Sequence, residues 1–303
     1  MECTMNLSIP KTVLGRTGLE VSRLGFGCAL WREGKSHWTP ERAEQVWNTA
    51  LDSGINFFDT SYDYVYSEEW IGRILEDRYD EFILATKCGC TDSWPTMNAS
   101  EHVWSRDNLM WGIEGSLRRL NREKVDVLQL HNATVNDCEE GRLIETLEEI
   151  RSQGLVDWIG ASTRLPDLPK LLAWDVFDVM QIPYSLLQRE HENLIQKASD
   201  AGVGIIIRGG IAQGEVGQGR GTQETWEKFV SAGLDEFLEE GETRSSFVLR
   251  YTLSNPKVDT VIVGTTRLEH LAENIDVVSR GDMQSDMYHE VKRRMDAIGE
   301  TSY

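Results

Sequence analysis

The feature that most constrains the fold is a regular alternation of short apolar runs with longer amphipathic segments. The runs are rich in β-branched or aromatic residues, and they span Leu24–Gly27, Asn56–Phe58, Phe82–Thr86, Val125–Leu130, Val156–Gly160, Val179–Ile182, Gly204–Ile207 and Val258–Val263. Their nearly continuous apolarity is typical of parallel strands buried on both faces. The intervening segments have helical periodicity and start signals, such as Thr39 followed by Pro40. Eight strands alternating with helices predict an α/β fold, a (β/α)8 barrel of the TIM-barrel type.

The alternative is a doubly wound parallel sheet, but no GxGxxG motif stands at any strand-to-helix turn. We find no interdomain linker, and 303 residues suit one barrel of roughly 250 residues with extensions. The sequence therefore predicts a single domain over residues 1–303. Residues 12–22, TVLGRTGLEVS, predict a short N-terminal β-hairpin closed by a Gly-containing turn.

Two long loops, residues 89–104 and 209–221, follow the third and seventh predicted strands. Both belong to the face on which barrel active sites lie, and we expect them to form a pair of lids.

Charge and cysteine content narrow the function classes. A net charge of −19 argues against nucleic-acid or anionic-membrane partners. The start lacks a leader pattern and no apolar run reaches 18 residues, which predicts a soluble cytoplasmic protein. The five cysteines include no CxxC pair. The Cys88-Gly-Cys90 spacing could suggest a metal or redox site, but no second cluster supports it, so we expect free thiols and no metal.

Polar residues stand where the predicted strands end. They are Asp59, Lys87, His131, Ser162, Thr163, Gln181, Arg208, Thr265 and Thr266. Because the carboxyl ends of barrel strands meet at one mouth, we expect these side chains to converge there as an active site.

The residue types indicate proton-transfer chemistry. Lys87 and Asp59 should pair, and a tyrosine beside that cation should have its pKa lowered toward neutrality. Such a tyrosine can protonate a developing alkoxide, while a neutral His131 donates a hydrogen bond to the same oxygen. The segment after Asp59, TSYDYVYS, offers three tyrosines at alternate positions, Tyr62, Tyr64 and Tyr66.

No side chain of this set can deliver a hydride, so redox chemistry would need a bound nicotinamide. Ser162, Thr163 and Gln181 are hydrogen-bonding types suited to a carboxamide. The Gly-rich stretch 209–221 offers backbone N–H groups for a pyrophosphate, and residues 265–274 begin a helix, which is a natural anion site.

At these residues the sequence resembles the aldo-keto reductase family. The resemblance runs from KTVLGRTGLEVSRLGFGCALW through GINFFDTSYDYVYSE, FILATKCG, SLRRLNREKVDVLQLH, IGAST, QIPYSLLQR and GGIAQG to GTTRLEHLAENI. It implies a (β/α)8 barrel that binds extended NADPH without a Rossmann motif and reduces aldehydes and ketones. The family's Asp–Tyr–Lys–His tetrad falls on Asp59, Tyr64, Lys87 and His131. Tyr64 lies five residues after the aspartate and three before the serine of a Ser-Glu pair, as the family places it. Tyr62 and Tyr66 fit neither spacing and are expected to pack or to form part of the pocket wall.

The sequence departs from the family pattern at several positions. Val65 replaces the glycine that usually follows the tyrosine. Ser162-Thr163 replaces a Ser-Asn pair on the carboxamide, and Arg208 stands where many members place an aromatic on the nicotinamide ring. An arginine can stack there or reach a phosphate.

The segment expected to bind the adenosine end of the cofactor departs most from the family pattern. The resemblance places the cofactor on Ser162, Thr163, Gln181, Arg208, Gly209, Gly210, Gly264, Thr265, Thr266, Arg267, His270, Glu273 and Asn274. In the family, the segment that binds the 2′-phosphate often starts with Lys-Ser and has a later Arg. The matching positions here are Gly264, Thr265 and His270, so two cations are lost, and Arg267 could replace one of them. The resemblance favours NADPH and leaves NADH as the alternative.

Trp31, Val65 and Cys88 are the candidate substrate-pocket residues, with plain packing an equal alternative for Trp31 and Cys88. We expect His37, His102, His191 and His289 to be surface or loop residues.

The predicted function is NAD(P)H-dependent interconversion of an aldehyde or ketone and its alcohol, with Tyr64 as general acid and base. Two alternatives remain: a lyase that forms a Schiff base on Lys87, and a reductase-like regulatory protein that senses the cofactor. The sequence reveals neither the substrate nor the oligomeric state.

Overall fold

The eight predicted strands form a closed parallel barrel in the order β10-β3-β4-β5-β6-β7-β8-β9. The computed structural model describes residues 9–29, 39–91 and 102–302. The barrel strands are β3 (Leu24–Gly27), β4 (Phe57–Asp59), β5 (Ile83–Cys88), β6 (Val125–His131), β7 (Val156–Ser162), β8 (Val179–Pro183), β9 (Gly204–Arg208) and β10 (Thr260–Val263). The predicted fold class is therefore confirmed, with strand bounds that differ from the predicted ones by at most two residues.

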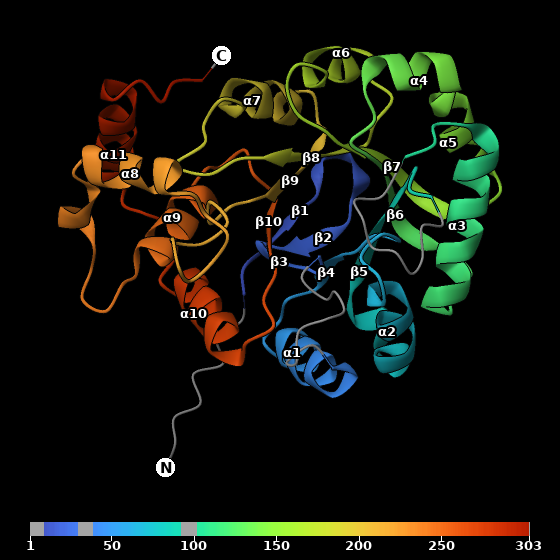
Figure 1. Cartoon of the computed structure of the whole chain (residues 1–303), viewed down its shortest axis with the longest axis horizontal. Coiled ribbons are helices and arrows are strands. Elements are labelled where there is room, and N and C mark those ends of the chain that lie inside the picture. Colours follow the sequence, from blue (N-terminus) through green and yellow to red (C-terminus); the bar gives the residue numbers. More distant parts are fainter. Residues whose placement is uncertain (1–8, 30–38, 92–101, 303) are drawn as a thin grey trace.

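Helices surround the barrel and cover its outer face (Figure 1). They are α1 (Pro40–Asp52), α2 (Ser67–Ile74), α3 (Arg106–Leu120), α4 (Val135–Gly141), α5 (Leu143–Ser152), α6 (Leu168–Ala173), α7 (Glu192–Asp200), α8 (Gln223–Ser231), α9 (Arg244–Leu253), α10 (Leu268–Ser279) and α11 (Ser285–Ala297). The predicted start signals act as caps. The hydroxyl of Thr39 accepts a hydrogen bond from the backbone N–H of Arg42, and that of Ser105 accepts one from Asn108.

Short 3-10 helices complete the chain: η1 (Gly15–Thr17), η2 (Glu76–Glu81) and η3 (Leu234–Phe237). None of the helices in the described part of the chain is both long and apolar enough to cross a membrane.

The N-terminal hairpin closes one end of the barrel. Its strands β1 (Lys11–Val13) and β2 (Glu20–Ser22) pair antiparallel, as predicted. Leu14 and Val21 pack into a buried apolar cluster with Phe57, Val127 and other inward-facing side chains of the barrel. A Cβ on Gly15 would lie 2.2 Å from the backbone nitrogen of Gly204, the first residue of β9, so the turn requires glycine.

The hairpin contacts the amino ends of the strands, since Arg16 donates its backbone N–H to the carbonyl of Gly202 just before β9. A larger apolar core fills the space between the barrel wall and the helices. The hairpin covers the amino ends of the strands, and the helices cover the outside of the barrel. The carboxyl ends of the strands therefore form the open mouth of the barrel, where polar side chains can gather.

Candidate active site

Asp59 and Lys87 form a buried ion pair at the carboxyl end of the barrel. Asp59 ends β4, and Lys87 lies near the end of the neighbouring strand β5. The Lys87 Nζ donates to Asp59 Oδ2 at 2.6 Å and to the backbone carbonyl of Thr60 at 2.9 Å. Both side chains are almost completely excluded from solvent. The predicted pair is present, and its geometry fixes the ammonium group in one position.

The second oxygen of Asp59 is held by two amides. Gln129 Nε2 donates to Asp59 Oδ1 at 3.0 Å and Gln181 Nε2 at 2.7 Å. The carboxylate therefore accepts hydrogen bonds from three donors, which satisfy its oxygens in the buried site. Sequence reasoning identified Gln181 but missed Gln129. The signal was a polar residue within a mostly apolar run, two positions before His131.

The surroundings keep Lys87 protonated. Burial alone would lower the pKa of the Lys87 ammonium, but Asp59 and the phenol of Tyr64 outweigh it and raise the pKa above its ordinary value. A protonated amine is a poor nucleophile, so this geometry disfavours Schiff-base chemistry.

Tyr64 lies in the turn after β4, next to both the cation and the histidine. The Lys87 Nζ is 4.9 Å from the centre of its ring, and the ring of His131 stands edge-on to it at 6.0 Å. Burial raises the pKa of Tyr64 to about 12, although Lys87 pulls in the opposite direction. The expectation of a pKa lowered toward neutrality is thus wrong for the protein alone, because desolvation of the phenolate exceeds the attraction of one ammonium that Asp59 already neutralises.

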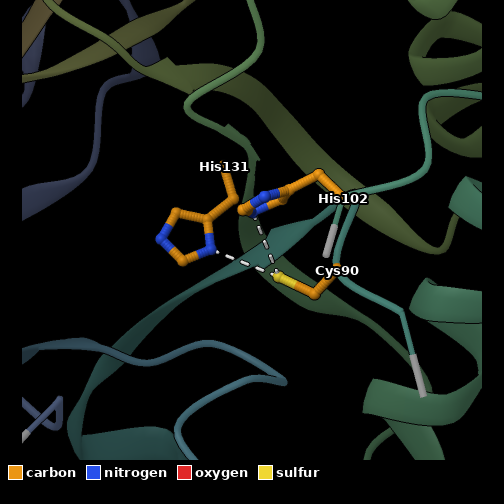
Figure 2. Close-up of side chains that lie close together, drawn as sticks. All are labelled: Cys90, His102 and His131. Carbon is orange, nitrogen blue, oxygen red and sulfur yellow. Dashed lines mark hydrogen bonds between the residues drawn. The ribbon is translucent and has the colours of Figure 1, made fainter. Parts of the chain in front are cut away.

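His131 ends β6 and is buried beside Tyr64. Burial lowers the pKa of its imidazole, so the ring is neutral at physiological pH, as expected. Its Nδ1 lies 3.4 Å from Ser61 Oγ. The same nitrogen lies 3.2 Å from Cys90 Sγ, a contact drawn in Figure 2. A neutral imidazole can donate one hydrogen bond, which suits a carbonyl oxygen.

The other two tyrosines of the segment pack, as expected. Tyr62 lies edge-on to Trp111 at 5.6 Å, with the Arg119 guanidinium 4.0 Å from its ring centre. Tyr66 stacks on Trp70 with an interplanar angle of 7°.

Val65 has the left-handed backbone conformation, with φ of +59°. A β-branched residue is strained there by about 1–2 kcal/mol, whereas glycine is not. The family's preference for glycine after the tyrosine therefore has a backbone origin, and this chain holds the turn with a valine.

A cavity of about 590 Å³ opens beside Asp59 and Tyr64. Its walls include most of the predicted cofactor residues: Gln181, Arg208, Gly209, Gly210, Gly264, Thr265, Thr266, Arg267, His270, Glu273 and Asn274. Ser162 and Thr163 are buried behind this wall, and Ser162 Oγ donates to Gln181 Oε1 at 3.3 Å. The lining thus joins the catalytic mouth to the start of α10.

Sequence reasoning missed part of the cavity wall. Thr243 and Ser245, at the start of α9, line it and were not predicted. The predicted Gly-rich loop lines it as well, through Gln213, Gly214, Glu215, Gln218, Gly219 and Arg220. The hydroxyls of Thr243 and Ser246 both donate to Glu273 Oε1, which ties α9 to α10. The available signal was the Thr-Arg-Ser-Ser helix start at residues 243–246.

Arg208 ends β9 and its guanidinium contributes a cation to the cavity wall. Its buried Nε has no hydrogen-bond partner among the described residues, and burial lowers the pKa of the guanidinium. A buried donor without a partner is costly, so a ligand oxygen at this point would be favoured.

The three candidate pocket residues have different placements. Trp31 lies outside the described residues, as do residues 92–101 of the first predicted lid. Val65 is half-buried, and Cys88 is buried with its thiol donating to the Gln129 carbonyl at 3.5 Å. Neither is part of the cavity wall described above.

A parallel barrel with a buried ion pair, a tyrosine and a neutral histidine at its mouth defines an enzyme of the (β/α)8 class. A model of the aldo/keto reductase family matches residues 23–295. The chain belongs to this family and is an NAD(P)H-dependent oxidoreductase that acts on carbonyl compounds.

Individual relatives agree over nearly the whole chain. The "Uncharacterized oxidoreductase YqkF" of Bacillus subtilis (strain 168) is 27% identical over 288 residues, covering 89% of this chain and 91% of the relative. A "Probable voltage-gated potassium channel subunit beta" of Oryza sativa subsp. japonica is 23% identical, with 86% and 89% covered. The solved structure "aldo-keto reductase AKR11C1 from Bacillus halodurans (holo form)" is 25% identical, covers 97% and 98%, and superposes with a TM-score of 0.85.

Proposed function

We propose that the chain reduces an aldehyde or ketone to its alcohol, with Tyr64 protonating the carbonyl oxygen. The observation that carries this proposal is the position of the Lys87 ammonium. It is fixed by Asp59, lies 4.9 Å from the Tyr64 ring centre and sits beside a cavity of about 590 Å³.

Each residue has a role that its surroundings support. NADPH or NADH, when bound, supplies the hydride. Tyr64 keeps its proton at neutral pH and releases it only as negative charge develops on the substrate oxygen. Lys87 stabilises the phenolate that remains, and Asp59 holds the ammonium in place. Neutral His131 donates a second hydrogen bond to the same oxygen.

The cavity wall fits a dinucleotide. Gln181 and Arg208 offer donors next to Asp59, where a carboxamide would lie, and residues 209–221 offer backbone N–H groups for a pyrophosphate. Arg267 stands at the N-cap position of α10, where its side chain makes no capping hydrogen bond, and it is exposed, so its guanidinium is accessible to a 2′-phosphate. On this basis we propose NADPH as the preferred cofactor.

The direct test is titration of the purified protein with NADPH and with NADH, followed by a carbonyl panel read at the nicotinamide absorbance. We expect one cofactor per chain, NADPH bound at least about tenfold more tightly because it adds a charge-assisted contact, and turnover of small aldehydes. Turnover without a nicotinamide, together with borohydride trapping of the substrate on Lys87, would overturn the proposal.

One observation supports the alternative of a cofactor-sensing regulatory protein: a relative from rice carries the name of a channel subunit. Tight cofactor binding without turnover across the panel, together with a stable partner on pull-down, would favour it. The buried tetrad, in which Lys87 and Tyr64 keep their protons beside a neutral His131, favours the enzyme.

The reaction should depend on pH in opposite ways for its two directions. With the pKa of Tyr64 near 12, the phenol is protonated over about pH 6–9, so kcat for carbonyl reduction should be flat there. Alcohol oxidation needs the phenolate, so its kcat should rise about tenfold per pH unit over the same range. Initial rates in both directions at saturating cofactor test this, and a flat oxidation profile would contradict it.

We also propose a reducing, cytoplasmic compartment and a small-molecule partner. Cys28, Cys88, Cys90 and Cys138 are buried free thiols, which is typical of such a compartment.

A further inference from the structure

Three metal-binding side chains meet on the Nδ1 side of His131. Cys90 follows β5, and it pairs with His102 in an isolated antiparallel bridge. Cys90 Sγ lies 3.2 Å from His131 Nδ1 and 3.7 Å from His102 Nε2. The three ligand atoms lie within 4.8 Å of one another, and Figure 2 shows the side chains pointing toward a common point.

We propose that Cys90, His102 and His131 bind a zinc ion, a site beyond the reductase function. Zinc bonds of about 2.0–2.3 Å in a tetrahedron place ligand atoms roughly 3.3–3.8 Å apart, close to the two separations given above. One thiolate and two imidazoles favour zinc over magnesium or calcium, which prefer oxygen ligands. Three protein ligands leave the fourth position to water.

The site is built rather than accidental, because its backbone is held by other side chains. The Asn108 side-chain amide donates to the carbonyls of Gly89, Cys90 and Val103, which fixes the two paired segments together. The indole of Trp104 stacks on His102 at 5.2 Å with an interplanar angle of 7°.

A glycine makes room for this packing. A Cβ on Gly89, whose φ is +102°, would lie 2.0 Å from the Trp104 ring. The tryptophan therefore packs directly over the backbone beside Cys90 and holds the His102 ring toward it.

The charges also fit a divalent cation. Coordination replaces the Cys90 thiol proton, which passes to solvent and leaves a thiolate. The carboxylate of Asp63 lies 3.5 Å from His131 Nδ1 and supplies a second negative charge. His102 is half-buried, whereas Cys90 and His131 are buried, so the ion has solvent access from the His102 side.

Zinc at this site would act on the imidazole that faces Tyr64. A metal on Nδ1 leaves Nε2 as the nitrogen that carries the proton, so zinc-bound His131 can only donate through Nε2. The sequence shows no second group of metal ligands near the Cys88-Gly-Cys90 motif. The fold brings two histidines to Cys90, His102 and His131, which follow it by 12 and 41 residues in the chain.

The test is a zinc titration against a chromophoric chelator in excess Mg²⁺, using the whole protein. We expect one zinc per chain, and Co²⁺ in its place should give thiolate-to-cobalt absorption and the visible bands of tetrahedral cobalt. Cys90→Ser and His102→Ala should each weaken zinc binding by about 10–100-fold or more. Cys138→Ser, which removes a buried thiol outside the cluster, should bind zinc as the parent does.

Circular dichroism of each variant is the control for folding. His102→Ala changes only a half-buried loop side chain, so the test does not depend on Cys90→Ser alone. Substoichiometric zinc, or equal affinity in the parent and both cluster variants, would overturn the site. Since the readout is binding, failure here leaves the proposed reductase function intact, and failure of turnover leaves the zinc result intact.

Discussion

Tyr64→Phe should reduce turnover by about 10²–10⁴-fold while the cofactor dissociation constant changes little. Removing one positioned general acid costs a rate factor of this size. The phenol lies beside Asp59 and Lys87 at the end of the cavity, and phenylalanine keeps the packing of the ring edge-on to His131. The measurement is kcat for an aldehyde from the panel, together with quenching of protein fluorescence by NADPH.

Tyr62→Phe is the matched control for this prediction. Tyr62 lies two residues earlier in the same turn, but its ring packs against Trp111 and Arg119. The same loss of one hydroxyl should therefore leave kcat within about twofold, as most substitutions away from the chemistry do. Equal kcat in Tyr64→Phe and the parent would exclude Tyr64 as the proton donor.

The parts of the molecule that could be predicted are those set by local pattern and spacing. The nearly continuous apolarity of runs such as Gly204–Ile207 indicated buried parallel strands, and polar residues at the strand ends then had to meet at one mouth. The double spacing to Asp59 and Ser67 selected Tyr64, and the packing of Tyr62 and Tyr66 agrees with that choice.

The parts that could not be predicted depend on distances between segments far apart in the chain. The pKa of Tyr64 is set by how completely the barrel mouth excludes water, which no spacing reveals. Thr243 and Ser245 belong to a helix start and carry no strand-end signal.

Two histidines show the same limit. His102 was expected at the surface or in a loop, and it does lie outside the named helices and strands, but the expectation did not place its ring 5.2 Å from that of His131. His191 was also expected there, yet it is buried, and its Nε2 accepts a hydrogen bond from the backbone N–H of Leu165 at 3.0 Å.

Lys87→Met should have the largest effect on stability among changes at the site, and it should also abolish turnover. The ammonium makes a 2.6 Å contact with Asp59, and both side chains are almost fully buried. Removing one partner of a buried ion pair leaves the other charge uncompensated, at a cost of about 3–5 kcal/mol in the free energy of unfolding. The amides of Gln129 and Gln181 remain on Asp59 Oδ1, so we expect the lower part of this range.

The double variant Asp59→Asn/Lys87→Met separates stability from chemistry. Replacing both members removes the buried charge, so urea denaturation should recover about 1–3 kcal/mol relative to Lys87→Met alone. Turnover should stay at the level of Lys87→Met, because no cation remains to stabilise the Tyr64 phenolate. If the double variant recovered turnover together with stability, Lys87 would be a structural residue only, and the role assigned to the ammonium in proton transfer would be wrong.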